Sequence, residues 1–242
     1  MIHMRATIKS YLTDQRFGAT LERARHWLYL ALGLFLTGLF VKLSHNVLYD
    51  AEDRSWIQHW DNVVLLFIAE HRSGPVTASL IDITALGSVT IVSLIGFVFL
   101  TVFYLLRDKC GILQLVLASF GAGFWTWAFK SFVERPRPTI VTQLVEVTGH
   151  SFPSGHSLAA AALYFTFATM AGKHFGSWPR ALALQGLAAL VIVSVAFSRV
   201  YLGVHYPSDV ISGALFGAAW AYLVAGLVAT MQKHYLKQRR SQ

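Results

Sequence analysis

The sequence has 242 residues, of which 55% are hydrophobic and 13% are charged, and its formal net charge is +8 at pH 7. This composition is too apolar for a typical soluble domain and places the chain in the membrane class. A single cysteine, Cys110, excludes an internal disulfide framework, and no cysteine spacing typical of a zinc site is present. The basic residues lie mostly in short segments between apolar stretches, which indicates membrane topology rather than a nucleic-acid surface.

Six apolar stretches are long enough to cross a bilayer, and they predict an all-α integral membrane protein built as a six-helix bundle. They occupy residues 27–43, 88–106, 111–131, 155–172, 181–198 and 209–230. The polar, basic segment before them lacks a following small-residue cleavage site, so a retained anchor is expected rather than a removed signal peptide. The expected division is a basic N-terminal segment (1–26), a six-span domain (27–232) and a basic tail (233–242).

Two weaker apolar stretches, 63–69 and 76–86, lie between the first and second spans. Polar residues, a glycine and a proline interrupt them, so they predict interfacial helices in the first external loop rather than a seventh span. Asp82 and Thr84 belong to the second stretch and are interpreted as residues at the entrance of a site, without a catalytic role.

The distribution of lysine and arginine predicts the orientation of the chain. With the six expected spans, thirteen of the 20 basic residues fall on the side of the two termini. The positive-inside rule therefore predicts that both termini are cytoplasmic. Spans three and five end on the face where spans four and six begin, so polar clusters at these ends share one face, which is expected to be external.

The first such cluster follows the third span and reads KSFVERPRP from Lys130 to Pro138. Its prolines end the helix and leave the basic side chains at the membrane surface. Lys130 and Arg137 are candidate anion ligands, although for this cluster alone a cationic flank that extends to the lipid headgroups is the better explanation. Arg135 is interpreted as a surface cation.

The second cluster opens the fourth span and includes Pro153, Ser154, Gly155 and His156. Ser154 is expected to cap the helix, and Gly155 lets the backbone approach a ligand at a helix start that favours anions. The alternative is a plain cap with an incidental histidine. The nearby His150 is interpreted as a loop residue.

The third cluster lies between spans five and six and contributes Arg199, His205 and Asp209. Ionisable residues at the end of an apolar span indicate a functional site. Arg199 adds a third cation on the same face, and cations without matching local acids favour an external anion such as a phosphate. Two histidines and an aspartate could then supply proton transfer and a nucleophile.

Together the three clusters read K-x-x-x-x-x-x-R-P, P-S-G-H and S-R-x-x-x-x-x-H-x-x-x-D in this order. They resemble the three-part signature of the type 2 phosphatidic acid phosphatase superfamily, which includes membrane lipid phosphatases, soluble acid phosphatases and vanadium haloperoxidases. No key position is substituted, and the six-span frame extends the resemblance over most of the chain.

The resemblance implies a metal-independent hydrolase without a cofactor. In it, His205 is the nucleophile that forms a phosphohistidine, Asp209 orients its ring, and His156 is the general acid and base. The phosphoryl group is held by five residues: Lys130, Arg137, Ser154, Gly155 and Arg199.

The same resemblance implies a lipid substrate, because the site lies at the membrane face. The chain is similar to bacterial undecaprenyl diphosphate and phosphatidylglycerophosphate phosphatases. The expected main reaction converts undecaprenyl diphosphate to undecaprenyl phosphate in the bacterial inner membrane, with phosphatidylglycerophosphate and phosphatidic acid as further substrates. A lipid phosphotransferase, a haloperoxidase and a non-catalytic lipid-binding scaffold are the alternatives, and the oligomeric state stays open.

Overall fold

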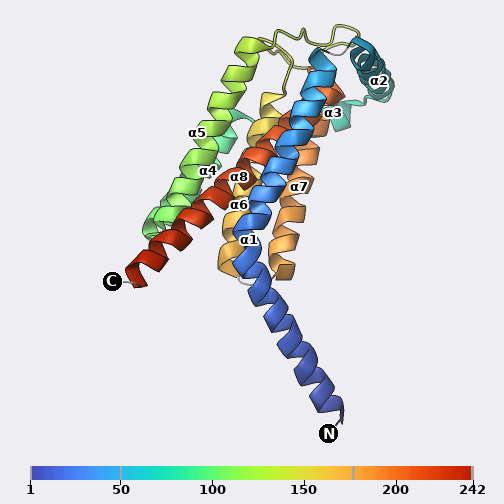
Figure 1. The fold of residues 1–242 in the computed structure, drawn as a ribbon. Coiled ribbons are helices and arrows are strands. Elements are labelled where there is room, and N and C mark those ends of the chain that lie inside the picture. Colours follow the sequence, from blue (N-terminus) through green and yellow to red (C-terminus); the bar gives the residue numbers. More distant parts are fainter. Residues whose placement is uncertain (1, 50, 176–177, 241–242) are drawn as a thin grey trace.

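The computed structural model describes the backbone of residues 2–49, 51–175 and 178–240, and the side chains of residues 24–49, 55–173, 179–235 and 238. Every regular element in these ranges is an α-helix, which confirms the predicted all-α class. Figure 1 shows the helices α1 (Ile2–Leu48), α2 (Ala51–Glu70), α3 (Gly74–Ala85), α4 (Val89–Leu105), α5 (Lys109–Phe132), α6 (Gly155–Phe175), α7 (Trp178–Tyr201) and α8 (Pro207–Arg240).

Each of the six predicted spans overlaps one helix, and in chain order these helices are α1, α4, α5, α6, α7 and α8. Four helical segments are long and apolar enough to cross a membrane: Ala24–Leu48, Lys109–Phe132, Pro179–Tyr201 and Pro207–Tyr235. Helices α3 and α4 meet the same test as a pair bent by 46°. The described residues thus contain four or five candidate spans, and the count of six stays a prediction.

The termini leave the molecule at the same end of the bundle (Figure 1). Helix α1 continues across residue 26 and α8 continues across residue 233, so no change of secondary structure marks the expected domain boundaries. That division and the cytoplasmic location of the termini stay predictions.

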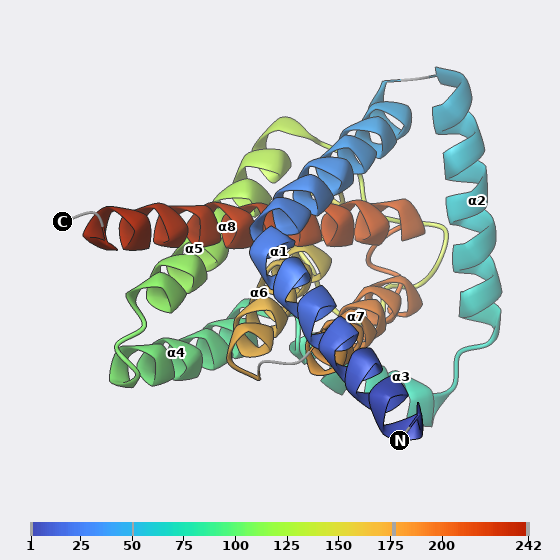
Figure 2. The same ribbon diagram turned by 60° about the horizontal axis from the view of Figure 1, so that its bottom comes forward.

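Helix α6 lies at the centre, with α5 and α7 beside it and α8 crossing it (Figure 2). Its alanines at 160, 161 and 162 are fully buried. Small side chains let helices approach closely inside a membrane, where packing rather than the hydrophobic effect drives association. The sequence of α6 therefore suits a helix enclosed by other helices.

Two glycines of α8 form the contact with α6. A Cβ atom at Gly213 would lie 2.5 Å from the carbonyl oxygen of Ser154, and one at Gly217 would collide with the carbonyl oxygen of Leu158. These backbone contacts require glycine. They bring the start of α8 against the start of α6.

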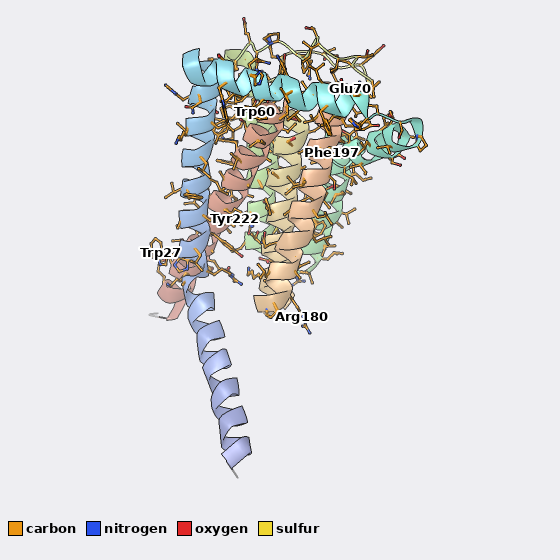
Figure 3. All side chains as sticks on the ribbon, turned by 90° about the vertical axis from the view of Figure 1, so that its right-hand side faces the viewer. Trp27, Trp60, Glu70, Arg180, Phe197 and Tyr222 are labelled. Atoms are coloured by element: carbon orange, nitrogen blue, oxygen red, sulfur yellow. The ribbon has the colours of Figure 1, made fainter. Side chains whose placement is uncertain are left out.

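Helices α2 and α3 connect α1 to α4 and contain the two weaker apolar stretches. Figure 3 shows α2 lying across the ends of the other helices, at a steep angle to them. Its inner face buries Asp61 and Leu65, whereas Trp60 and Phe67 on its outer face are 50% and 62% exposed. The helices themselves agree with the prediction, and their interfacial location stays a prediction.

Candidate active site

The three polar clusters meet at the end of the bundle opposite the termini. Lys130 lies in the last turn of α5 and Arg199 in the last turn of α7. Helices α6 and α8 begin at the same end, and the segment 133–154 crosses it (Figure 1). The structure therefore brings together the residues that the alternation of spans was expected to bring together.

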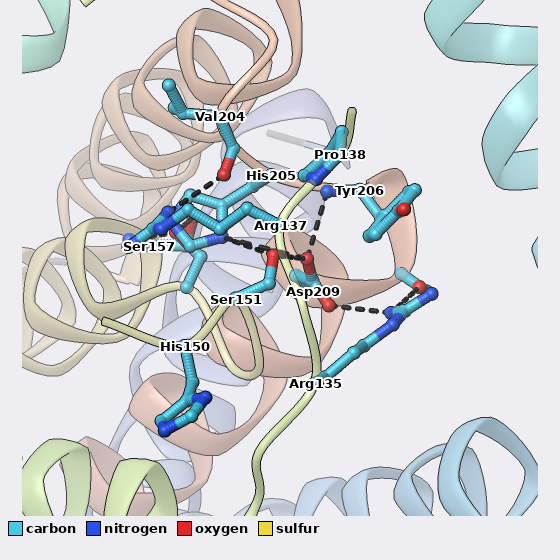
Figure 4. A network of polar contacts seen from close by, with 12 residues as sticks. Arg135, Arg137, Pro138, His150, Ser151, Ser157, Val204, His205, Tyr206 and Asp209 are labelled. Carbon is cyan, nitrogen blue, oxygen red and sulfur yellow. Dashed lines mark hydrogen bonds and ion pairs between the residues drawn. The ribbon is translucent and has the colours of Figure 1, made fainter. Parts of the chain in front are cut away.

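His205 and Asp209 form a buried pair. His205 lies in the short connection between α7 and α8, and its Nδ1 atom is 3.6 Å from Oδ2 of Asp209 in the first turn of α8. The same oxygen accepts hydrogen bonds from the backbone N–H of Tyr206 at 2.9 Å and from the hydroxyl of Ser151 at 2.5 Å (Figure 4). These donors fix the carboxylate facing the imidazole ring.

Arg137 contacts the opposite side of this ring. Its Nη1 atom lies 3.2 Å from Nε2 of His205 and 2.8 Å from the carbonyl oxygen of Val204. Because a guanidinium can only donate, Nε2 must accept. The proton of a neutral ring then resides on Nδ1, toward Asp209, and Nε2 keeps its lone pair.

Burial has the largest effect on the pKa of His205, which it lowers to about 4. Asp209 opposes this effect, while Arg137 and Arg199 reinforce it through their positive charges. At neutral pH the ring is therefore uncharged, which is the form that a nitrogen nucleophile needs.

The other two cations approach from neighbouring helices. Lys130 donates from Nζ to the carbonyl oxygen of His150 at 3.0 Å. Arg199 is 4% exposed and donates from Nη1 to the hydroxyl of Thr84 at 3.1 Å, while its buried Nε has no hydrogen-bond partner among the described residues. An unpaired buried donor with positive charge is suited to an anionic oxygen.

The start of α6 supplies the predicted cap. The Ser154 hydroxyl accepts from the backbone N–H of Ser157 at 3.5 Å, and the Ser154 backbone N–H donates to the carbonyl oxygen of Asp209 at 3.0 Å. A Cβ at Gly155 would lie 3.0 Å from Cγ2 of Thr126, so glycine allows α5 to pack close to this turn. The cap thus joins α6 to the start of α8.

His156 follows in the first turn of α6 and is partly exposed. It lies close enough to His205, Arg199 and Lys130 to interact with them electrostatically. All eight predicted site residues therefore occupy one region of the protein.

Arg135 was interpreted as a surface cation, and this interpretation is wrong. Its side chain is 10% exposed and forms ion pairs with Asp61 and Asp209. Its guanidinium carbon also lies 4.3 Å from the centroid of the Tyr206 ring. No sequence signal indicated these contacts, because Asp61 belongs to α2, far away in the chain.

The structure also shows the surroundings of three other residues that the sequence analysis interpreted. Asp82 is exposed on α3, while Thr84 is buried and contacts Arg199, which its sequence context did not indicate. His150 is a half-buried loop residue, as predicted, and Figure 4 shows its ring apart from the network around Asp209.

Among the described side chains, no group of three or more histidine, cysteine, aspartate or glutamate residues is placed to hold a metal ion. The predicted site residues supply three cations, two histidines and a carboxylate, and Arg135 and Asp61 add a fourth cation and a second carboxylate. They offer an imidazole with a free lone pair and positive charge around the atom that it could attack.

The fold and the site define a class: a multi-pass helical membrane protein with a histidine–aspartate pair set among cations suited to a phosphoryl group. Residues 111–233 match the family model of the PAP2 superfamily, and this range contains all eight predicted site residues. The chain belongs to the PAP2 superfamily, which confirms the resemblance found in the sequence.

Its relatives include lipid phosphatases. The chain is 41% identical to phosphatidylglycerophosphatase B of Bacillus subtilis over 40% of its own length and 48% of that protein, so this alignment spans about half of the relative. It is 26% identical to an undecaprenyl-diphosphatase of Sulfolobus acidocaldarius over 85% of this chain and 92% of that one.

A solved structure is similar over most of the fold. It is the transmembrane PAP2-type phosphatidylglycerolphosphate phosphatase from Bacillus subtilis, with a TM-score of 0.73 and 26% identity over 82% of this chain and 96% of that chain. The likeness extends beyond the range of the family match.

Proposed function

We propose that this lipid phosphatase of the PAP2 superfamily hydrolyses lipid phosphates or diphosphates through a phosphohistidine, with undecaprenyl diphosphate as its main substrate. The observation that carries the proposal is the environment of His205. Its Nε2 accepts from Arg137, its Nδ1 faces Asp209, and the buried ring is uncharged at neutral pH.

In the first step, the lone pair of Nε2 of His205 attacks phosphorus while the bond from phosphorus to the leaving oxygen breaks. His156 donates a proton to that oxygen. The ring becomes positively charged, and Asp209 stabilises it through the proton on Nδ1. In the second step, His156 takes a proton from a water molecule, whose oxygen attacks phosphorus and breaks the phosphorus–nitrogen bond.

The phosphoryl oxygens are held by Lys130, Arg137 and Arg199, with the Ser154 hydroxyl and the Gly155 amide. Charge on these oxygens is redistributed in the transition state, so fixed cations stabilise it more than water would. The three cations take the electrostatic role that a metal ion takes in other phosphatases. We therefore expect turnover in the presence of a chelator.

The substrate class follows from the location of the site. It lies at the ends of apolar helices, where a lipid headgroup can reach it without leaving the membrane. Undecaprenyl diphosphate is released on the external face of the bacterial inner membrane, and cytoplasmic termini would place the site there. The names of the relatives support both undecaprenyl diphosphate and phosphatidylglycerophosphate as substrates.

The test compares undecaprenyl diphosphate, phosphatidylglycerophosphate and phosphatidic acid on one detergent-purified preparation containing EDTA, ranked by kcat/KM for phosphate release. We expect the diphosphate to rank first. A different leading lipid would overturn the substrate assignment, and a strict requirement for Mg²⁺ would overturn the metal-free chemistry.

The intermediate is tested with ³²P-labelled substrate and a rapid quench. We expect an acid-labile, base-stable protein adduct that His205→Ala abolishes together with turnover. His234→Ala is the matched control, because it removes an exposed histidine far along α8. Full turnover by a folded His205→Ala protein would refute the proposed nucleophile.

A further inference from the structure

A buried network connects α2 to the carboxylate that faces His205. Arg135 donates from Nη1 to Oδ1 of Asp209 at 2.6 Å and from Nη2 to Oδ2 of Asp61 at 2.8 Å. Gln58 accepts from the same Nη2 at 3.0 Å, and the Ser208 hydroxyl accepts from Nη1 at 2.8 Å. Four acceptors therefore hold one guanidinium in a single orientation.

Asp61 also holds the residue that precedes Asp209. Its Oδ1 accepts from the backbone N–H of Ser208 at 2.9 Å, and its Oδ2 accepts from the Ser208 hydroxyl at 2.5 Å. The Asp61 side chain is 3% exposed and that of Asp209 is fully buried. Helix α2 thus fixes the first turn of α8 through one side chain.

We propose that Arg135 and Asp61 are positioning residues for the reaction: Arg135 fixes the Asp209 carboxylate toward His205, and Asp61 offsets the charge of Arg135. This inference rests on the roles proposed above for His205 and Asp209. It makes α2, which lies outside the three motifs, a working part of the site.

The first argument is geometric. Arg135 binds Oδ1 of Asp209, whereas Ser151, Tyr206 and His205 all meet Oδ2. A carboxylate held on both oxygens cannot rotate away from the imidazole. Preorganisation of this kind matters because a displacement of about 1 Å at a reacting group can cost roughly 10²-fold in rate.

The second argument concerns charge. Arg135 alone would neutralise Asp209 and weaken its attraction for the positive ring that forms at His205. Asp61 restores one net negative charge to the group of three. Burying the Asp61 carboxylate carries a desolvation penalty, and its ion pair with Arg135 compensates for that penalty. The same pair keeps Arg135 from leaving an uncompensated positive charge beside Asp209.

The charges around His205 set the background for a test based on pH. They come from α5, the segment 133–154, α6, α7 and α8: Lys130, Arg135, Arg137, His156, Arg199 and Asp209. Four of these six residues are arginines or lysine, which carry a positive charge at neutral pH. Loss of one negative charge on Asp61 therefore makes the surroundings of the ring more positive, and loss of Arg135 makes them more negative.

The experiment measures phosphate release from phosphatidic acid in mixed detergent micelles across pH. We expect Asp61→Asn to move the acid limb of kcat/KM to lower pH by about 0.5–1 unit and Arg135→Gln to move it upward by a similar amount. Both should lower kcat by about 10–10²-fold with little change in KM. The double variant should return the limb toward its original pH without restoring kcat.

Two further variants separate charge from geometry. Arg135→Lys keeps the charge but cannot span both carboxylates, so we expect an unchanged acid limb and a reduced kcat. Glu70→Gln removes an exposed charge from the same helix and should leave both quantities unchanged. Asp61→Asn is nearly isosteric and Arg135→Lys keeps the positive charge, so these two variants keep the test decisive if Arg135→Gln does not fold.

Titration of His205 by NMR of ¹⁵N-labelled histidine, assigned with His205→Ala, reads the coupling without turnover. Opposite shifts in the two single variants of a protein that hydrolyses no lipid phosphate would refute the proposed function and support the positioning network. Normal hydrolysis with no opposite shifts in either measurement would refute the positioning roles and leave the proposed function standing.

Discussion

The contact between α6 and α8 makes Gly213→Ala a sensitive perturbation of the site. The new Cβ would lie 2.5 Å from the carbonyl oxygen of Ser154 and 3.3 Å from the backbone nitrogen of Leu158. Reaching an ordinary contact of about 3.4 Å with that oxygen requires a separation of roughly 0.9 Å. Both neighbours are backbone atoms, so the helices themselves must move.

This movement would act directly on the catalytic pair. Ser154 donates its backbone N–H to the carbonyl oxygen of Asp209 at 3.0 Å, so separating α6 from α8 lengthens that bond and displaces the two helix starts. Overpacking of this kind costs about 1–3 kcal/mol of stability. A displacement near 1 Å also predicts a kcat reduced by roughly 10–10²-fold.

The assay combines kcat and KM for phosphate release with the midpoint of thermal unfolding in detergent. Gly186→Ala on α7 is the matched control, because a Cβ there meets no atom within 4 Å. Its stability should stay unchanged or rise by up to about 1 kcal/mol through helix propensity. Wild-type kcat and stability in Gly213→Ala would refute the reasoning, because they would show that the helices separate without consequence for the site.

Three further outcomes are expected. Since burial lowers the pKa of His205 to about 4, protonation of this ring should reduce kcat/KM only below about pH 4. A pH profile of kcat/KM that falls near pH 6.5, the ordinary histidine value, would contradict this. Thr84→Val removes the hydroxyl that accepts from Arg199, and leaving that buried donor unpaired should raise KM by about 10-fold in the micelle assay; an unchanged KM would show that Thr84 does not position it. Ser151→Ala removes a 2.5 Å hydrogen bond to Asp209 and should lower kcat by about 10-fold at constant KM, whereas a change in KM alone would assign Ser151 to binding.

The convergence of the three motifs could be predicted from sequence because alternation of spans alone decides which helix ends share a face. Lys130, His156, Arg199 and His205 needed no knowledge of distances for that step. Their roles follow from the superfamily pattern and stay predictions, while the structure shows that the side chains can meet.

The two arginines at 135 and 137 show where sequence reasoning stopped. They are separated by one proline and followed by another, which favours an extended backbone, in which side chains two residues apart point to the same side. Arg137 reaches Nε2 of His205, and Arg135 reaches the far oxygen of Asp209. The second contact depends on a long-range neighbour, Asp61, whose burial no local pattern revealed.

Helix α6 illustrates a feature that a hydropathy profile does not report, namely whether a helix contacts lipid or protein. Helix α6 contacts mainly protein and can contain polar residues such as Thr166 and Thr169. Both hydroxyls donate to backbone carbonyl oxygens of α6 at 2.7 and 2.8 Å, and Thr169 also accepts from Gln114 of α5 at 2.8 Å. The central position of α6 also places Ser154 and His156 among groups from four other segments. A site built from several helix ends thus has at its centre a helix that contacts mainly protein and contains polar residues.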